Sequence, residues 1–278
     1  MDRPSNLLVK ITNAEFDQLV NFVYDKYGIN LSKKRQLVEG RLSHTLKDRG
    51  IGSFQEYMDL LIRDKSGDEM LNFLNKITTN YSYFARETEH FEFLLELALP
   101  YLEKNRTREL RIWSAGCSAG QEAYNIAMTM DQYFGSKKGM WDTRILATDI
   151  SMNVLNKGKE AIYPEDNIKD LPPQWKTQYF NRLPDGSYQV NDKIRREVIF
   201  RVFNLMDPLV YKKPFDIIFC RNVMIYFDQD TRNKLVDKFY DATSEGGYLL
   251  IGHSEVLDKS ATRYRFIRPS IYQKLKKI

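Results

Sequence analysis

Apolar residues recur at helical spacing through the first quarter of the chain. A capping-box pattern that begins at Thr12 opens the first run, and a similar pattern at Ser53 opens the third. Ser32 is expected to cap the second helix, and a fourth helix is expected at about residues 68–77. Short connections between four amphipathic helices predict an all-α domain over residues 1–78.

From residue 92 to residue 278 the pattern alternates apolar strands with amphipathic helices. This alternation predicts an α/β domain with a mostly parallel sheet and right-handed crossovers. Two short apolar runs flank Pro269 too closely for a helical crossover, so an antiparallel hairpin is expected there. The five expected core strands are residues 109–114, 143–148, 198–203, 215–220 and 247–252.

One insertion interrupts the alternation. Residues 183–186 read Leu-Pro-Asp-Gly, which is a turn signal, and aromatic residues flank it on both sides. We expect a small β-hairpin subdomain at about residues 175–200.

Composition and charge narrow the class of protein. No apolar run approaches the ~20 residues of a membrane span, so a cytoplasmic protein without membrane insertion is expected. Only two cysteines occur, Cys117 and Cys220, which favours neither a disulfide framework nor a structural zinc site. With 3 histidines, no metal centre is expected. The formal charge of +5 conceals a basic stripe, because residues 26–49 hold 7 basic side chains against 2 acidic ones. Such a stripe suits an acidic partner surface, although solvated helix faces are ordinarily charged.

The segment with the clearest chemistry is residues 111–127, an apolar strand followed by a turn of small residues and a helix. Gly116 and Gly120 let backbone approach a ligand closely, and free N–H groups at the helix start would face that ligand. Glu122 stands in the first helical turn, where a phosphate would meet like charge. A cofactor with a cationic end, such as S-adenosylmethionine, therefore fits better than a dinucleotide. An ordinary strand-turn-helix crossover is the alternative.

Ligands of open α/β sheets bind beyond the carboxyl ends of the strands. Asp149 ends the second expected strand, where an acid can accept both ribose hydroxyls, and a helix N-cap is its alternative role. Asn204 follows the third strand and suits an adenine edge, with a turn asparagine as the alternative. The polar stretch that begins at Cys220 follows the fourth strand.

Residues 79–91 join the helical domain to the sheet and are rich in aromatic and hydroxyl side chains. A linker without a task would be rich in Gly, Pro or Ser, so we interpret this one as a lid with Asn80, Ser82 and Arg86 facing inward. The planar guanidinium of Arg86 matches a carboxylate of the cofactor, of the substrate, or of a surface residue such as Glu89.

Four separated motifs occur in a characteristic order. They are Thr-Thr-Asn with Phe-Ala-Arg at 78–86, the glycine turn through Glu122, Ala-Thr-Asp-Ile at 147–150, and Cys-Arg-Asn-Val-Met-Ile-Tyr-Phe at 220–227. Together they resemble the CheR-type chemotaxis protein-glutamate methyltransferases. The resemblance covers nearly the entire chain, including the closing Gly-His-Ser-Glu at 252–255. The run at 220–227 is its most specific part.

The resemblance implies a Rossmann-like class I methyltransferase sheet with a terminal antiparallel hairpin. It implies transfer of a methyl group from S-adenosylmethionine to glutamate side chains of methyl-accepting chemotaxis proteins, which leaves S-adenosylhomocysteine. Arg86 and Tyr226 are the candidate catalytic residues, with Tyr226 near the transferred methyl group. The family often has Thr where this chain has Ser82, and both supply a hydroxyl. The pocket residues implied by motif position are Asn80, Ser82, Arg86, Glu122, Asp149, Asn204, Leu205, Cys220 and Arg221.

In this family the N-terminal helices and the inserted hairpin dock on chemoreceptors, so the enzyme would be recruited to membrane receptor arrays. Lys34, Arg41 and Lys47 lie near one face of the second expected helix and are the candidate receptor-binding residues. Some members hold a receptor's C-terminal pentapeptide through a longer hairpin tip. The short tip at 182–188 predicts an enzyme that works without this tether, and we expect a monomer.

Two rival interpretations stay open. The basic net charge and the many Tyr and Phe residues prompt a nucleic-acid methyltransferase. Such enzymes typically carry Asp/Asn-Pro-Pro-Tyr/Phe after the fourth strand, where this chain reads Cys-Arg-Asn-Val-Met from Cys220. A non-catalytic adaptor of the same fold is the second rival, and the retained Arg86, Glu122, Asp149 and Tyr226 argue against it.

Overall fold

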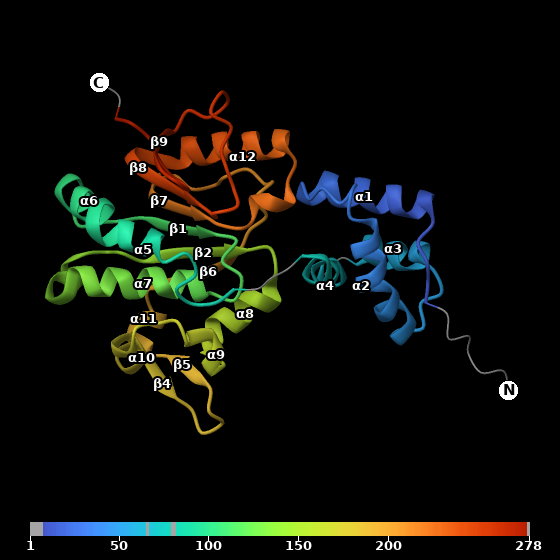
Figure 1. Ribbon diagram of the computed structural model, residues 1–278, viewed down its shortest axis with the longest axis horizontal. Helices are drawn as coiled ribbons and strands as arrows, with labels where there is room; N and C mark the ends of the chain where they lie inside the picture. The colour runs from blue at the N-terminus through green and yellow to red at the C-terminus, as the bar shows by residue number, and fades with distance from the viewer. Residues whose placement is uncertain (1–7, 65–66, 79–81, 277–278) are drawn as a thin grey trace. The chain divides into compact units, whose positions relative to one another are not determined.

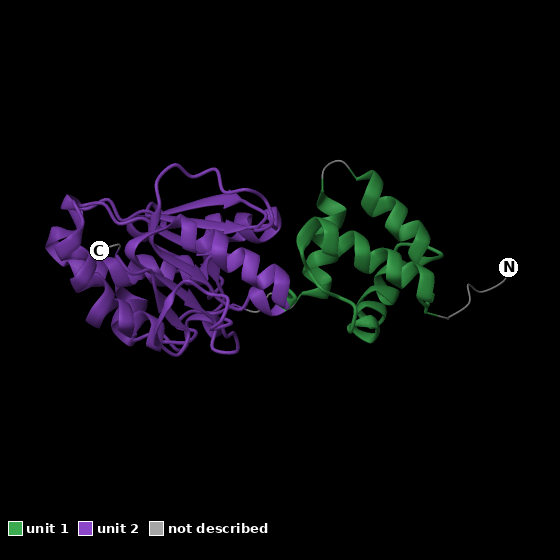
Figure 2. Cartoon of the chain, turned by 90° about the horizontal axis from the view of Figure 1, so that it is seen from above, with its two compact units in different colours: residues 1–80, 226–228 green, residues 81–225, 229–278 purple. Residues whose placement is uncertain are grey.

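The computed structural model describes residues 8–64, 67–78 and 82–276. The chain divides into two compact units (Figure 2). Unit 1 comprises residues 1–80 with 226–228, and unit 2 comprises residues 81–225 with 229–278. Within the described ranges, no helix is long and apolar enough to cross a membrane.

Unit 1 is built from α1 (Asn13–Tyr27), α2 (Arg35–Asp48), α3 (Phe54–Arg63) and α4 (Asp68–Ile77). The predicted capping box at the start of α1 is present, since the Glu15 N–H donates to Thr12 Oγ1 and the Thr12 N–H donates to the Glu15 carboxylate. The predicted Ser32 cap of α2 is wrong. α2 begins at Arg35 with Lys34 in the N-cap position, so Ser32 lies two residues too early to cap it, and its N–H and hydroxyl donate to Asn30 Oδ1 instead.

Unit 2 is built on a seven-stranded sheet with the strand order β6-β2-β1-β7-β8-β10-β9 (Figure 1). The parallel strands are β1 (Ile112–Ala115), β2 (Ile145–Asp149), β6 (Val198–Val202), β7 (Phe215–Cys220) and β8 (Thr243–Ile251). β10 (Ile271–Gln273) pairs antiparallel with β8 and with β9 (Arg265–Arg268). The predicted fold class is confirmed. The chain switches direction across the sheet between β1 and β7, which is where such folds bind ligands.

The two faces of the sheet bury different side chains of β1. Ile112 belongs to the hydrophobic cluster that includes residues of α7 (Gln121–Phe134), whereas Trp113 packs edge-on against Phe239 of α12 (Gln229–Ala242) at 5.4 Å between ring centroids. Because successive side chains of a strand point to opposite faces, α7 and α12 cover opposite faces of the sheet. α8 (Met152–Glu160) follows β2.

Residues 89–105 form an interrupted helix. It consists of α5 (Glu89–Phe93), the π-helical η1 (Leu94–Ala98) and α6 (Leu99–Asn105). Pro100 lacks the N–H that would bond one turn back, which favours an irregular turn just before it. Two short 3-10 helices lie elsewhere in the chain: η2 (Gly135–Met140) precedes β2, and η3 (Met224–Tyr226) follows β7.

The insertion forms a separate sheet with the order β3-β5-β4. The expected hairpin is present as β4 (Phe180–Arg182) and β5 (Tyr188–Val190), but β3 (Ile162–Tyr163) adds a third strand. A helix that was not predicted, α10 (Pro173–Tyr179), precedes the hairpin and has a proline at its first position. The short helices α9 (Glu165–Ile168) and α11 (Asp192–Arg195) flank this sheet in sequence.

Candidate cofactor and active site

The site residues gather at one edge of the sheet of unit 2. Strands β6, β2, β1 and β7 are parallel neighbours, so their carboxyl ends meet at the same edge (Figure 1). The glycine turn follows β1, Asp149 ends β2, Asn204 follows β6 and Arg221 follows β7. The structure therefore brings together groups that are dispersed over more than a hundred residues of sequence.

The glycine turn has a tighter structural requirement than the sequence indicated. Gly116 and Gly120 have φ of 86° and 89°, a region that strongly favours glycine. A Cβ on Gly116 would lie 2.4 Å from Val223 Cγ2, and one on Gly120 would lie 2.9 Å from Phe200 Cζ. The space beside Gly116 is thus filled by Val223, which follows β7, and the space beside Gly120 by Phe200 of β6.

Asp149 is held by backbone donors. Its Oδ2 accepts the Ser118 N–H at 2.9 Å and its Oδ1 accepts the Ser151 N–H at 3.0 Å. Ser151, and not Asp149, caps α8. Burial raises the pKa of Asp149 and the backbone donors only partly offset this. A carboxylate offers about four acceptor sites, so Asp149 is still able to accept hydroxyl donors.

Arg221 is the electrostatic centre of the site. Its side chain is buried; Nε donates to Glu87 Oε2 at 3.1 Å, and Nη2 forms an ion pair with the same oxygen at 3.0 Å. Nη1 donates to Glu122 Oε2 at 3.1 Å, and Nη2 also donates to the carbonyl of Arg86. Two carboxylates around one guanidinium leave a net negative charge, which suits a cationic ligand group.

Glu122 stands at the start of α7, as predicted. Its Oε1 accepts the Ser114 hydroxyl at 2.6 Å. Burial raises the pKa of Glu122, and although Arg221 and Ser114 act in the opposite direction, the net shift is upward. A further cation beside Glu122 would favour its ionised form, so the residue fits the ammonium group of an amino-acid cofactor.

The segment that carries Arg86 has an unusual backbone. The residues on either side of it, Ala85 and Glu87, have φ of 59° and 55°. Non-glycine residues hold this conformation only where the surroundings enforce it. Here the Ala85 N–H donates to Asn125 Oδ1 at 3.1 Å, and Arg221 binds the Arg86 carbonyl. The Arg86 guanidinium lies over the ring of Tyr83 at 6.0 Å.

The remaining predicted pocket residues have the following partners and burial. Asn204 Oδ1 accepts the Met206 N–H at 3.0 Å, which is the turn role considered as its alternative. The Leu205 carbonyl accepts from Lys238 Nζ at 2.7 Å. Cys220 is fully buried, and burial raises the pKa of its thiol, so it is no thiolate nucleophile. Ser82 is half-buried, and Asn80 lies outside the described residues.

Two polar residues of the site, Glu87 and Glu255, were not predicted. Glu87 holds Arg221, and its Oε1 accepts from Asn222 Nδ2 and from the His253 N–H, each at 3.2 Å. Glu255 is buried and accepts the backbone N–H groups of Gly252, Asn222 and Ile225 at 2.6, 2.9 and 3.2 Å. It thereby fixes the loop that follows β7. The closing Gly-His-Ser-Glu motif was the only sequence signal for Glu255.

Tyr226 groups with unit 1. Its carbonyl accepts the Asn30 N–H at 2.8 Å, and its ring lies 5.3 Å from Lys34 Nζ. Arg41 donates to the carbonyls of Lys76 and Thr78 at 2.8 and 3.3 Å, beside the end of α4. Lys47 is exposed.

The parallel sheet with its terminal antiparallel pair, the glycine turn after β1 and the acids at the start of α7 and the end of β2 together define a class I S-adenosylmethionine-dependent methyltransferase. Residues 80–272 match the S-adenosylmethionine-binding domain of the CheR methyltransferases, and residues 14–78 match their all-alpha domain. The chain belongs to the CheR methyltransferase family, which confirms the resemblance seen in the sequence.

Two relatives show the extent of the similarity. The chemotaxis protein methyltransferase of Borreliella burgdorferi is 44% identical over 275 residues, which are 97% of each chain. The chemotaxis protein methyltransferase of Escherichia coli is 35% identical over 267 residues, which are 94% of this chain and 91% of the relative.

Proposed function

We propose that this enzyme methylates glutamate side chains in the cytoplasmic domains of chemotaxis receptors and so forms the methyl esters of sensory adaptation. The observation that carries the proposal is the CheR architecture over both units, with the buried Glu87–Arg221–Glu122 cluster at the carboxyl ends of β1 and β7. The relatives named for chemotaxis support the same substrate.

The reaction requires little acid–base chemistry. A glutamate carboxylate has a reference pKa near ~4.3, so the nucleophile is already ionised at neutral pH. S-adenosylmethionine supplies a methyl group activated by its sulfonium. Glu122 would hold its ammonium group and Asp149 its ribose hydroxyls. The chain aligns the reacting groups and excludes water, and alignment can lower the activation free energy by up to roughly 7–11 kcal/mol.

Within this proposal, Arg86 positions the attacking carboxylate and Tyr226 donates a hydrogen bond to it. We expect Arg86→Ala and Tyr226→Phe to lower turnover more than cofactor affinity, because their partner is the substrate. Steady-state kinetics with receptor substrate and binding of S-adenosylhomocysteine separate the two effects, with Tyr24→Phe on α1 as the matched control. Wild-type turnover in both variants would remove these residues from the mechanism.

The basic side chains of α2 would attract an acidic receptor helix. Arg41 keeps its charge although it donates to two carbonyls, since neutral acceptors do not cancel a cation. Reversing the charges at Lys34 and Lys47 to Glu should slow receptor methylation at low salt and flatten its salt dependence. Lys104→Glu on α6 is the control, and an unchanged rate in the double reversal would contradict this docking surface.

The hairpin tip supports methylation without a pentapeptide tether. Only a short turn joins β4 to β5, closed by the Leu183 N–H on the Ser187 carbonyl at 2.8 Å. Receptor fragments with and without the C-terminal pentapeptide should therefore be methylated at equal rates.

One labelling experiment tests the proposal against its rivals. The full chain is incubated with tritiated S-adenosylmethionine and either a receptor fragment, the same fragment with its acceptor glutamates changed to alanine, or RNA. We expect label only on the intact receptor fragment, released by base as methanol. Glu122→Gln should abolish labelling while Glu109→Gln, at the other end of β1, should not. Label on RNA would instead show a nucleic-acid methyltransferase, and cofactor binding without any label would show an adaptor.

A further inference from the structure

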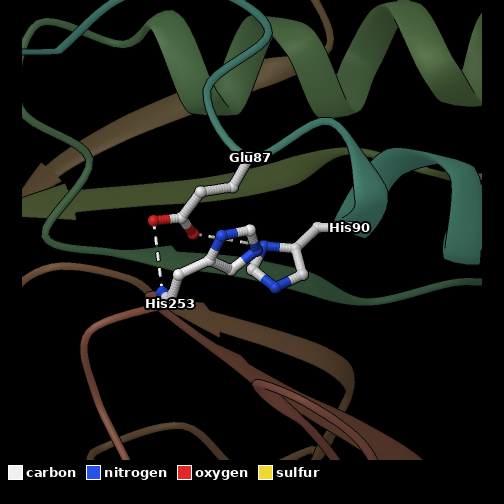
Figure 3. A group of neighbouring side chains, drawn as sticks. All are labelled: Glu87, His90 and His253. Carbon is white, nitrogen blue, oxygen red and sulfur yellow. Dashed lines mark hydrogen bonds and ion pairs between the residues drawn. The ribbon is translucent and has the colours of Figure 1, made fainter.

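Two of the three histidines of the chain lie together beside Glu87. Figure 3 shows the carboxylate of Glu87 next to the imidazoles of His90 and His253. One potential ligand atom from each of the three residues lies within 4.8 Å of the others. Glu87 lies just before α5 and His90 in its first turn, whereas His253 follows β8.

His90 is the unusual member of this group. It is 1% exposed, and neither ring nitrogen has a hydrogen-bond partner within the described part of the chain. Burial, with a further contribution from the Arg221 cation, lowers the pKa of His90 to about 3. Its Nδ1 lies 3.5 Å from Glu87 Oε2, close to the carboxylate but without a hydrogen bond to it. A neutral imidazole with an unused nitrogen is the form that binds metal ions.

The spacing suits a tetrahedral ion. His90 Nδ1 lies 3.5 Å from Glu87 Oε2. Ligand atoms at about 2.0–2.1 Å from a tetrahedral Zn²⁺ stand about 3.3–3.4 Å apart, so these two need almost no movement. The His253 side chain is 46% exposed, so an ion could reach the site from solvent.

The surrounding charges are compatible with a divalent cation. Arg221 and Arg268 are the cations that act on His90, and Glu87, Glu89 and Glu122 are the nearby carboxylates. The formal balance is one net negative charge. Glu87 would have to share Oε2 between Arg221 and the ion, while its Oε1 accepts only from uncharged donors.

We propose that Glu87, His90 and His253 form a binding site for a divalent transition-metal ion of the zinc type, with water as the fourth ligand. Three protein ligands and one open position are the arrangement of exposed zinc sites. Imidazole nitrogens favour such ions over Mg²⁺ or Ca²⁺.

Metal binding at this site opposes cofactor binding. An ion on Glu87 withdraws one carboxylate from Arg221, and the guanidinium then pairs more strongly with Glu122. Glu122 is the residue assigned to the cofactor's ammonium group. Because linkage is reciprocal, the metal weakens cofactor binding and the cofactor weakens metal binding by the same factor.

Metal binding is tested on the full chain without an affinity tag. Isothermal titration with Zn²⁺ should show one ion per chain, and Co²⁺ should give visible absorption bands of nitrogen and oxygen ligation. His90→Ala and His253→Ala should each weaken binding at least tenfold, and His44→Ala on α2 should leave it unchanged. His253→Ala keeps the test decisive if His90→Ala does not fold, because His253 is exposed.

The proposal fails if Zn²⁺ does not bind stoichiometrically, if His253→Ala binds it as tightly as the wild type, or if Co²⁺ shows a thiolate charge-transfer band from Cys117 or Cys220. The coupling is measured as the Kd for S-adenosylhomocysteine, which saturating Zn²⁺ should raise several-fold in the wild type and not in His253→Ala. An equal Kd with and without Zn²⁺ in the wild type would refute the coupling.

Discussion

A methyl group added at Gly116 tests how the turn that follows β1 packs against the loop that follows β7. Gly116→Ala places a Cβ 2.4 Å from Val223 Cγ2 on a backbone with φ of 86°. An alanine in the left-handed region costs about 1–2 kcal/mol. Forcing a methyl group against a packed side chain costs about 1–3 kcal/mol more. We therefore expect the free energy of unfolding of unit 2 to fall by about 2–5 kcal/mol.

Two further variants separate the backbone cost from the steric cost. Gly186 has φ of 85°, and a Cβ added there would meet no heavy atom within 4 Å, so Gly186→Ala should lose only the backbone part, about 1–2 kcal/mol. Val223→Ala removes the clashing methyl group. The double variant Gly116→Ala/Val223→Ala should therefore be more stable than the sum of the two single effects predicts.

Tryptophan fluorescence during urea unfolding is the appropriate assay. Trp113, Trp141 and Trp175 all belong to unit 2, so the signal follows this unit even where unit 1 unfolds separately. Binding of S-adenosylhomocysteine should weaken in parallel. Equal losses in Gly116→Ala and Gly186→Ala, or strict additivity in the double variant, would refute the steric argument.

Other predictions concern the buried charges. Arg221→Met should cost about 3–5 kcal/mol at pH 7, because it leaves two buried carboxylates without their cation. Burial raises the pKa of Glu87 in the wild type, but Arg221 and hydrogen bonds outweigh burial, so the net pKa is lowered. The stabilisation from Glu87 is therefore complete above its unfolded pKa of about 4.3 and is lost as the pH falls through its lowered folded pKa. Without Arg221, burial raises the pKa of Glu87 in the folded state, so the stability lost in Arg221→Met should shrink as the pH falls toward 5. A loss of stability that does not depend on pH would contradict this reasoning. Glu255→Gln should lose about 1–3 kcal/mol, because an amide nitrogen cannot accept the N–H groups that the carboxylate accepts, whereas the exposed Glu245→Gln should change little.

Local patterns sufficed for much of the fold. β7 has the bounds that its apolar run predicted, and the Thr12 capping box is present, because both depend on neighbours in sequence. The Ser32 cap failed because α2 begins at Arg35, two residues later than that cap requires. The helix α10 that precedes the hairpin was not predicted, because the pattern did not distinguish a proline-started helix from an aromatic strand.

The residues of the candidate site likewise differ in whether local sequence patterns could place them. Glu122 and Asp149 were predictable because parallel strands bring their carboxyl ends to one edge. Glu87 was not, since its partners Arg221 and His253 lie 134 and 166 residues away along the chain. No periodicity encodes such contacts. They depend on how the segment before α5 crosses the loops that follow β7 and β8.

The identity of residue 221 matters more than its charge. Its Nε and Nη2 reach Glu87, Nη1 reaches Glu122, and Nη2 also reaches the Arg86 carbonyl. A lysine would offer one ammonium centre and could not span these partners at once. One guanidinium therefore links the backbone that carries Arg86 to the acid at the start of α7. If Glu122 holds the cofactor's ammonium group, as proposed, a cofactor that draws Glu122 away from Arg221 would strengthen the pairing of Arg221 with Glu87 and so couple cofactor binding to the conformation of residues 85–87.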